Sequence, residues 1–262
     1  MRALSFNVHH GVGADGRLDL ERIAALVAAC APDVVALQEV DSRLGRRSGG
    51  VDQPAWLGRR LGMAVAFGPT IDLAPAAPGG PRRRYGSAVL SPWPLRWWRN
   101  PPLPNPVGGE ARRYVEAALD VGGVAVRVLA THLQHDAAEG RRAQLRHLAR
   151  VASGVAAGVA ATGPARAGHG RPVVLLGDLN ATPDAPELQE LEGVLVDAWS
   201  VAGAGDRRTF PARRPRMAID HVFTSPDVGV EAVTVVRSDA SDHRPLVADL
   251  VLPGAPALVT AP

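Results

Sequence analysis

Polar residues of a few types recur where apolar segments of the sequence end. They occupy the segments SFNVH, ALQEV, LATHLQ, LLGDLN, MAIDHVF and SDHRP, and in that order they are Asn7, Glu39, His132, Asp178, Asn180, Asp220, Asp242 and His243. An unpaired buried charge costs several kcal/mol, so carboxylates at the buried ends of strands need a shared partner. Carboxylate and amide oxygens with few histidines suit Mg²⁺ or Mn²⁺ better than zinc. We therefore expect these side chains to meet around one divalent cation.

The same residue types meet the needs of phosphoryl transfer. That reaction requires charge to be neutralised on the non-bridging oxygens and a water molecule to be placed in line with the leaving group. A divalent ion, an Asn, an Arg and a protonated His supply the first requirement, and a carboxylate supplies the second. Asp220, if close to His243, favours the imidazolium form of that ring. Covalent acyl chemistry is disfavoured, because neither Cys30 nor any Ser lies in a nucleophile-elbow context.

Strands with a few separated helices must position these groups. Period-two and short apolar patterns predict strands over 3–8, 33–40, 85–91, 115–121, 124–133, 172–180, 217–225, 230–238 and 245–252. Helices are predicted over 20–30, where Asp19 is placed to cap, over 141–160 and, more briefly, over 187–193. Many strands with few helices favour sheets packed together with helices outside.

Length and composition favour one globular domain. The chain has 262 residues, of which 46% are apolar but only 4% aromatic, so Val, Leu and Ala must fill most of the core. α/β folds often fill this length as a single domain, and we expect one over residues 1–252, followed by a Pro/Ala-rich tail over 253–262. A net charge of +3 is compatible with a polyanionic substrate but too small to argue for one.

The sequence gives no sign of membrane insertion or export. No stretch is long and apolar enough to span a bilayer, and the opening MRALSFNVHH reads as a strand rather than as a signal peptide. A single Cys allows no disulfide within the chain, which fits a reducing compartment. We expect a cytoplasmic protein, monomeric and without stable membrane insertion.

Taken together and in this order, the motifs from SFNVH to SDHRP resemble the endonuclease/exonuclease/phosphatase superfamily, which includes deoxyribonuclease I. The resemblance implies a four-layer α/β/β/α sandwich, two packed mixed β-sheets with helices outside and the site at one end. It also implies metal-assisted attack of water on phosphoester bonds, with Mg²⁺ or Mn²⁺ as the cofactor. Glu39 resembles the principal metal ligand, with Asn7 beside it, and Asp242 resembles a further acidic residue of the metal site.

The resemblance assigns catalytic roles to five residues. His243 resembles the phosphate-contacting histidine, oriented by Asp220. Asp178 is similar to the residue that aligns or activates the attacking water, and Asn180 to one that holds a phosphate oxygen. His132 resembles the second catalytic histidine of the deoxyribonuclease-like branch.

Two further residues fall where the family places a Tyr and an Arg near the phosphate. These are Tyr85 in RYGSAVLS and Arg112 in EARRYVEA, with Arg113 as an alternative to Arg112.

Some positions depart from the family's pattern. His9 stands where the abasic-site branch has an Asp, Pro92 where an Arg is common and His221 where a Tyr is usual. The first departure argues against an abasic-site role. The segment RRSGGVDQ resembles a sub-branch of bacterial members, and its Asp52 and Gln53 could help to choose the substrate.

Other histidines have simpler interpretations. Those interpreted as structural or surface residues are His9, His10, His135, His147, His169 and His221, of which the first two and the last lie close to the expected site.

Three functions stay open. A metal-dependent phosphodiesterase or phosphomonoesterase is favoured, and a nuclease is the first candidate among these because of the arginine content and His132. A lipid or small-molecule phosphoesterase of the sphingomyelin or inositol-phosphate type is the alternative, suggested by the tryptophans of SPWPLRWWRN, although ordinary packing at a strand edge explains these too. A catalytically silent binding module on the same fold is the third, and the full set of acidic, Asn and His residues argues against it.

Overall fold

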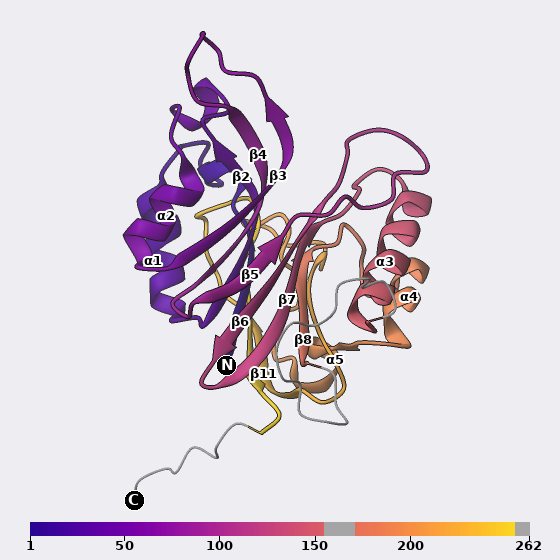
Figure 1. The fold of residues 1–262 in the computed structure, drawn as a ribbon. Coiled ribbons are helices and arrows are strands. Elements are labelled where there is room, and N and C mark those ends of the chain that lie inside the picture. The colour runs from indigo at the N-terminus through magenta and orange to yellow at the C-terminus, as the bar shows by residue number, and fades with distance from the viewer. Residues whose placement is uncertain (155–170, 255–262) are drawn as a thin grey trace, which may run out of the picture.

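The computed structural model describes residues 1–154 and 171–254, arranged as four layers (Figure 1). Two six-stranded mixed sheets pack face to face, and helices cover their outer faces. The predicted four-layer sandwich is confirmed. The helix predicted over 141–160 ends at Ala152, while residues 155–170, which include His169, and the tail from residue 255 lie outside the described residues.

The first sheet has the strand order β11-β12-β1-β2-β4-β3. In chain order its strands are β1 (Arg2–Asn7), β2 (Val34–Ser42), β3 (Ala64–Leu73), β4 (Arg83–Ser91), β11 (Gly229–Val235) and β12 (Leu246–Val251). Helices α1 (Leu20–Cys30) and α2 (Gln53–Leu61) cover its outer face. The predicted cap of α1 is present, since the Asp19 carboxylate accepts a hydrogen bond from the Arg22 N–H.

The second sheet has the strand order β5-β6-β7-β8-β10-β9. In chain order its strands are β5 (Leu95–Arg99), β6 (Tyr114–Val121), β7 (Val124–His132), β8 (Val173–Asp178), β9 (Val196–Asp197) and β10 (Asp220–Thr224). Helices α3 (Ala138–Ala152) and α4 (Gln189–Glu192) cover its outer face, and the short α5 (Ala198–Ala202) contacts β10 and β11. Single 3-10 turns occupy η1 (His9–Gly11), η2 (Arg46–Ser48) and η3 (Pro186–Leu188).

The alternation of side chains along each strand sorts the core into three clusters. Leu4 and Phe6 of β1 pack under α1 and α2, whereas Ala3 faces the second sheet. In β8, Leu175 packs under α3 and α4, whereas Val174 faces the first sheet. Successive strand side chains point to opposite faces, so each strand contributes to two clusters. Alanines and valines predominate between the sheets, and leucines predominate under α3 and α4.

Two buried positions in the sheets have little freedom to vary. Glu116 of β6 is 1% exposed and accepts hydrogen bonds from Arg99 and Arg127, at 2.6 and 2.7 Å. Gly86 of β4 has no room for a side chain, because a Cβ there would lie 2.1 Å from the Gly68 carbonyl oxygen of β3. Both positions join neighbouring strands.

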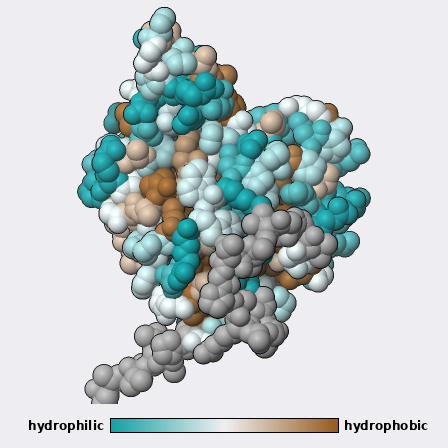
Figure 2. Space-filling model, in the orientation of Figure 1, coloured by the Kyte–Doolittle hydropathy of each residue, from teal (hydrophilic) through white to brown (hydrophobic). Residues whose placement is uncertain are grey.

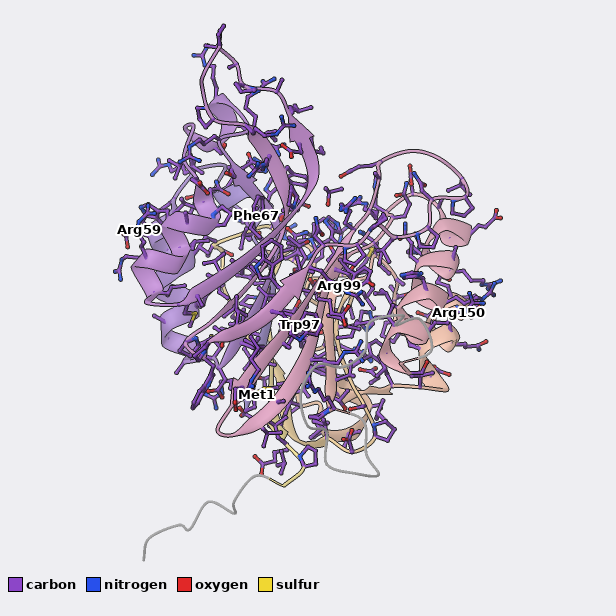
Figure 3. All side chains as sticks on the ribbon, viewed as in Figure 1. Met1, Arg59, Phe67, Trp97, Arg99 and Arg150 are labelled. Atoms are coloured by element: carbon purple, nitrogen blue, oxygen red, sulfur yellow. The ribbon has the colours of Figure 1, made fainter. Side chains whose placement is uncertain are left out.

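Three strands and two helices were not assigned from the sequence: β3, β5, β9, α2 and α5. The start of α2 fell within an expected loop, yet Asp52 caps this helix and Pro54 occupies its first turn. Strand β5 is an edge strand that carries Trp97 and Arg99, both labelled in Figure 3, and the half-exposed Trp98. Short edge strands with mixed composition give a weak period-two signal.

The β3–β4 hairpin extends beyond the body of the fold. The tip of this hairpin, at the top of Figure 1, is of intermediate hydropathy in Figure 2, with more hydrophilic residues below it. Its Asp72 pairs with Arg82 and Arg84. Among the described residues, no helix combines the length and the apolar character needed to cross a membrane.

Candidate active site

The ends of β1 and β8 bring the first two predicted residues together. Asn7 and Asp178 are the last residues of their strands, and alternation turns both toward the space between the sheets. The Asn7 side-chain amide donates hydrogen bonds to Glu39 Oε1 at 3.0 Å and to Asp178 Oδ2 at 3.1 Å. Its oxygen accepts a hydrogen bond from the His9 N–H at 3.1 Å. Asn7 therefore holds two carboxylates from different sheets side by side.

Glu39 reaches this point only because β2 is irregular. Val35 and Leu37 of β2 pack under the helices, so regular alternation would send Glu39 to the same side. The pairing of β2 with β4 shifts between Leu37 and Val40, and Glu39 has a φ of +59°. An extra residue in one strand redirects the side chains at that point, so the irregularity turns Glu39 into the site.

Asp178 is the centre of a network of polar groups. It is 2% exposed and accepts a hydrogen bond from the Asn180 N–H on Oδ1, at 3.0 Å. Its other oxygen lies 3.5 Å from His132 Nε2 and 3.7 Å from His243 Nε2. The carboxylate is thus fixed in orientation between two imidazole rings.

His243 is held between two carboxylates. Its Nδ1 lies 2.8 Å from Asp220 Oδ2, and its Nε2 faces Asp178. Burial alone would lower the pKa of His243, but Asp220, with help from Asp178 and Asp242, outweighs burial and raises it to about 10. The expected orientation of His243 by Asp220 is present, and the ring is an imidazolium at neutral pH.

His132 has the opposite character. Burial lowers its pKa to about 3, the Arg112 guanidinium acts in the same direction, and Asp178 offsets only part of the effect. The site therefore contains one charged and one neutral imidazole on either side of Asp178.

A pocket of about 330 Å³ opens above these groups. Its lining residues are Glu39, Tyr85, Glu110, Arg112, His132, His135, Asp178, Asn180, Phe210, Met217, Ile219, Asp242 and His243. Eight of the ten predicted site residues thus line it, and the other two, Asn7 and Asp220, support it from beneath through their hydrogen bonds. The structure brings the whole predicted set together.

Arg112 rather than Arg113 faces the pocket. Arg112 is 4% exposed, and its Nη2 lies 3.4 Å from Glu110 and 3.5 Å from His135 Nδ1. Arg113 instead donates to the Asn100 carbonyl oxygen outside the pocket. Burial raises the pKa of Tyr85, so its phenol is protonated and available as a hydrogen-bond donor.

Sequence reasoning missed five lining residues. Glu110, Phe210, Met217 and Ile219 had no assigned role, and His135, interpreted as a surface or helix residue, stands exposed at the mouth of the pocket. All five lie outside the helices and strands of the structure. Met217 and Ile219 fell within the strand predicted over 217–225, which begins only at Asp220; the other three lie in segments without a periodic pattern. Only the position of Glu110 two residues before Arg112 offered a hint.

His221 and the tryptophan segment SPWPLRWWRN do not line the pocket. His221 is fully buried and bonds the Ala181 carbonyl oxygen at 2.8 Å, in line with its structural interpretation. Trp93 donates to Asp33, which precedes β2 at the end of the sheet opposite to Asn7. The tryptophan segment therefore provides no rim for the pocket.

A sequence profile of the Endonuclease/Exonuclease/phosphatase family matches residues 4–243, from β1 to the pocket residue His243. The chain belongs to this family. A member of it from Beutenbergia cavernae DSM 12333 is 31% identical, with a TM-score of 0.76 over 98% of this chain and 72% of that one. A comparison with curated proteins returned no match.

More distant structures share the fold. A mannosyl-6-phosphatase from Bacteroides thetaiotaomicron VPI-5482 is 17% identical, with a TM-score of 0.77 over 96% of this chain and the whole of that one. A humanized TDP2 from D. rerio is 16% identical, with a TM-score of 0.67 over 96% of this chain and 98% of that one. At these identities the comparisons establish the architecture alone.

The residues present fit the divalent metal that the family implies. Glu39, Asp178 and Asp242 line one pocket, and burial raises the pKa of Glu39, with further contributions from the other two carboxylates. A cation would relieve this crowding of negative charge. Asn7 now presents its nitrogen to the carboxylates, so direct metal binding by its oxygen would require the amide to turn over and lose its bond to His9.

Proposed function

We propose that this protein hydrolyses phosphoester bonds with the help of a divalent cation held by Glu39 and Asp242, with Asn7 beside them. The observation that carries the proposal is the continuous arrangement Asp220, His243, Asp178 and Asn7 beneath one pocket. It places the His243 imidazolium and the fixed Asp178 carboxylate next to Glu39, whose carboxylate is suited to bind a cation.

The chain's own residues divide the work of the reaction. Asp178, fixed by Asn7 and the Asn180 N–H, orients the attacking water and accepts its proton. His243 donates from Nε2 to a phosphate oxygen, because Asp220 occupies its Nδ1 and keeps the ring charged. Arg112, Asn180 and the Tyr85 hydroxyl add donors to the remaining oxygens. When bound, the cation supplies further positive charge to the non-bridging oxygens.

For the substrate we propose a phosphodiester, with nucleic acid first among the candidates. A second hollow, the arginine groove, has a volume of about 400 Å³ and is lined by Arg213, Arg237, Ser238, Asp239 and Arg244. Neighbouring stretches of chain line the groove and the pocket, since Arg244 follows His243 and Arg213 lies between Phe210 and Met217 in the sequence. Three guanidinium groups beside the reaction centre suit a substrate with more than one phosphate.

A small phosphomonoester is the second candidate, and Glu110 favours it. Its Oε1 is shielded from solvent and has no hydrogen-bond partner among the described residues. A hydroxyl group of a sugar could donate to this oxygen, whereas a neighbouring nucleic-acid phosphate would be repelled by it. Sugar phosphates are the first compounds of this kind to try.

The test of hydrolysis uses bis-p-nitrophenyl phosphate and p-nitrophenyl phosphate with Mg²⁺, with Mn²⁺ and with EDTA. We expect metal-dependent turnover that Glu39→Gln lowers by at least a hundredfold. Glu21→Gln, on the exposed face of α1, is the matched control and should keep full activity. If no metal raises wild-type turnover above that of Glu39→Gln, the proposal is wrong.

The two substrate classes differ in their response to salt. For nucleic acid, Arg213→Ala with Arg237→Ala should weaken binding of single-stranded DNA and reduce the salt slope by about 1.4, which is about 0.7 for each lost phosphate contact. Arg59→Ala on α2 (Figure 3) should change neither. For a sugar phosphate, Glu110→Gln should raise KM and the double Arg variant should have no effect. If KM does not depend on salt, Glu110→Gln raises it and the double Arg variant leaves it unchanged, the substrate is a small sugar phosphate and not a nucleic acid.

A further inference from the structure

A group of metal-binding side chains beside Glu39 is not used by the proposed reaction. His9 and His10 follow β1, and one nitrogen from each ring lies within 4.8 Å of the other and of a Glu39 carboxylate oxygen. Asp242 Oδ1 lies 3.9 Å from His9 Nδ1, at the edge of the group. The ligand atoms therefore already face one another.

One nitrogen of each ring, Nδ1, has no hydrogen-bond partner among the described residues. Nδ1 of His9 and Nδ1 of His10 are both shielded from solvent, and neither has a hydrogen-bond partner in the part of the chain that the structure describes. A shielded polar atom without a partner is costly and calls for an explanation such as an ion. The rings contact each other edge to face, with centroids 4.4 Å apart, so neither satisfies the other.

The backbone is bent so that consecutive histidines face the same way. In a regular strand their side chains would point to opposite faces. Here φ is +43° at His9 and +46° at His10, a left-handed conformation that non-glycine residues rarely adopt. Such strain persists only where the surroundings enforce it, and it concentrates at functional sites.

Gln53 enforces this conformation. It is fully buried at the start of α2, and its Nε2 donates to the His10 carbonyl oxygen at 2.7 Å. Its Oε1 accepts a hydrogen bond from the Asp41 N–H at 2.9 Å. Gln53 thus holds the backbone that carries His9 and His10. It is a positioning residue for the two rings and does not line the pocket.

We infer that His9, His10 and Glu39 form a site for a first-row transition-metal ion such as Zn²⁺, Co²⁺ or Mn²⁺, with Asp242 at its edge. Two imidazoles and one carboxylate are a ligand set that suits these ions, and three protein ligands leave positions open. Mg²⁺ instead prefers oxygen ligands. The inference rests on the proposed function in so far as it names the metal at Glu39, but binding alone can test it.

The experiment titrates metal-free protein with Co²⁺ and follows the visible d–d absorption. We expect saturation at a single nitrogen-ligated Co²⁺, displacement by equimolar Zn²⁺ and no displacement by a hundredfold excess of Mg²⁺. His9→Asn and His10→Asn should each weaken Co²⁺ binding at least tenfold. Asn is chosen because it tolerates the left-handed backbone, and thermal melting in EDTA checks folding. His147→Asn, on α3 behind the second sheet, is the control and should bind as wild type does.

X-ray absorption of the Zn²⁺-loaded wild-type protein provides a measurement without variants, and we expect two imidazole scatterers. Oxygen-only coordination, equal affinity for Mg²⁺, or unchanged Co²⁺ binding in both histidine variants would overturn the inference. If the protein hydrolyses phosphoesters with Mg²⁺ and lacks the Co²⁺ signature, only this inference fails. If it binds Co²⁺ as expected and hydrolyses none of the esters, only the proposed function fails.

Discussion

Replacing Asp220 with Asn should make the activity depend on the protonation of His243 in the neutral pH range. In the wild-type protein the rise of the His243 pKa from 6.5 to about 10 corresponds to about 5 kcal/mol of preference for the charged ring. Asp220 contributes the largest favourable part of this preference. In Asp220→Asn, burial is opposed only by Asp178 and Asp242, and we expect the pKa to fall to about 6.5 or lower.

The size of the effect follows from the protonated fraction. At pH 7.5 the wild-type ring is almost fully protonated, whereas a ring with a pKa of about 6.5 is protonated in about one molecule in ten. Turnover of the variant should therefore fall at least tenfold at pH 7.5. The ratio of variant to wild-type turnover should rise about tenfold for each pH unit of acidification until the new pKa is reached.

The assay compares kcat of both proteins on bis-p-nitrophenyl phosphate from pH 5.5 to 8.5, at saturating metal. Taking the ratio at each pH cancels changes in metal binding and in other groups that both proteins share. An NMR titration of the His243 ring gives its pKa directly. If the ratio of variant to wild-type kcat stays constant across this range, the reasoning is refuted. Such a result would mean that Asp220 does not act by keeping His243 protonated.

Three further predictions concern stability. Glu116→Ala leaves two arginines without their buried partner and should lower the free energy of unfolding by about 3 kcal/mol, measured by guanidinium denaturation; a loss below about 1 kcal/mol would contradict it. Gly86→Ala forces β3 and β4 apart and should cost at least about 2 kcal/mol, whereas Gly193→Ala, with nothing within 4 Å of its Cβ, should change little; equal effects would show that the close approach is unimportant. Because the folded pKa of His243 is raised, its contribution to stability is complete below pH 6.5 and disappears as pH rises through about 10. The free energy of unfolding of the wild-type protein should therefore fall by up to about 5 kcal/mol over this interval, and that of Asp220→Asn should not. Parallel plots of unfolding free energy against pH for the two proteins would contradict this.

Much of the site could be predicted because several of its residues lie at an end of a regular strand. Asn7, Asp178 and Asp220 follow apolar runs, and alternation alone places them on the faces between the sheets. Glu39 is different, because regular alternation turns it toward the helices. Only the irregular pairing at Leu37 and Val40 brings it into the site, and no residue type in ALQEV marks that irregularity. The polar end of the apolar segment singled out Glu39, and the family resemblance gave it the role of principal metal ligand, but neither predicted the irregularity that turns it into the site.

The parts that could not be predicted depend on loops and on tertiary contacts. The direction of Glu110 and Phe210 depends on connections without periodicity, so the wall of the pocket was missed. The conformation of His9 and His10 depends on Gln53, which is 43 residues further along the chain from His10. Its VDQ segment read as a loop because the short helix α2 begins with Gln53-Pro54, where a proline more often signals a turn.

The position of β12 bears on when activity first arises during synthesis. β12 lies between β1 and β11, so β1, which carries Asn7, gains its second neighbour only from residues 246–251. Asp242 and His243 immediately precede that strand. A nascent polypeptide on the ribosome would thus hold an open sheet edge and an incomplete centre until these residues emerge. Fragments that end before Asp242 would lack two residues of the proposed site as well as β12.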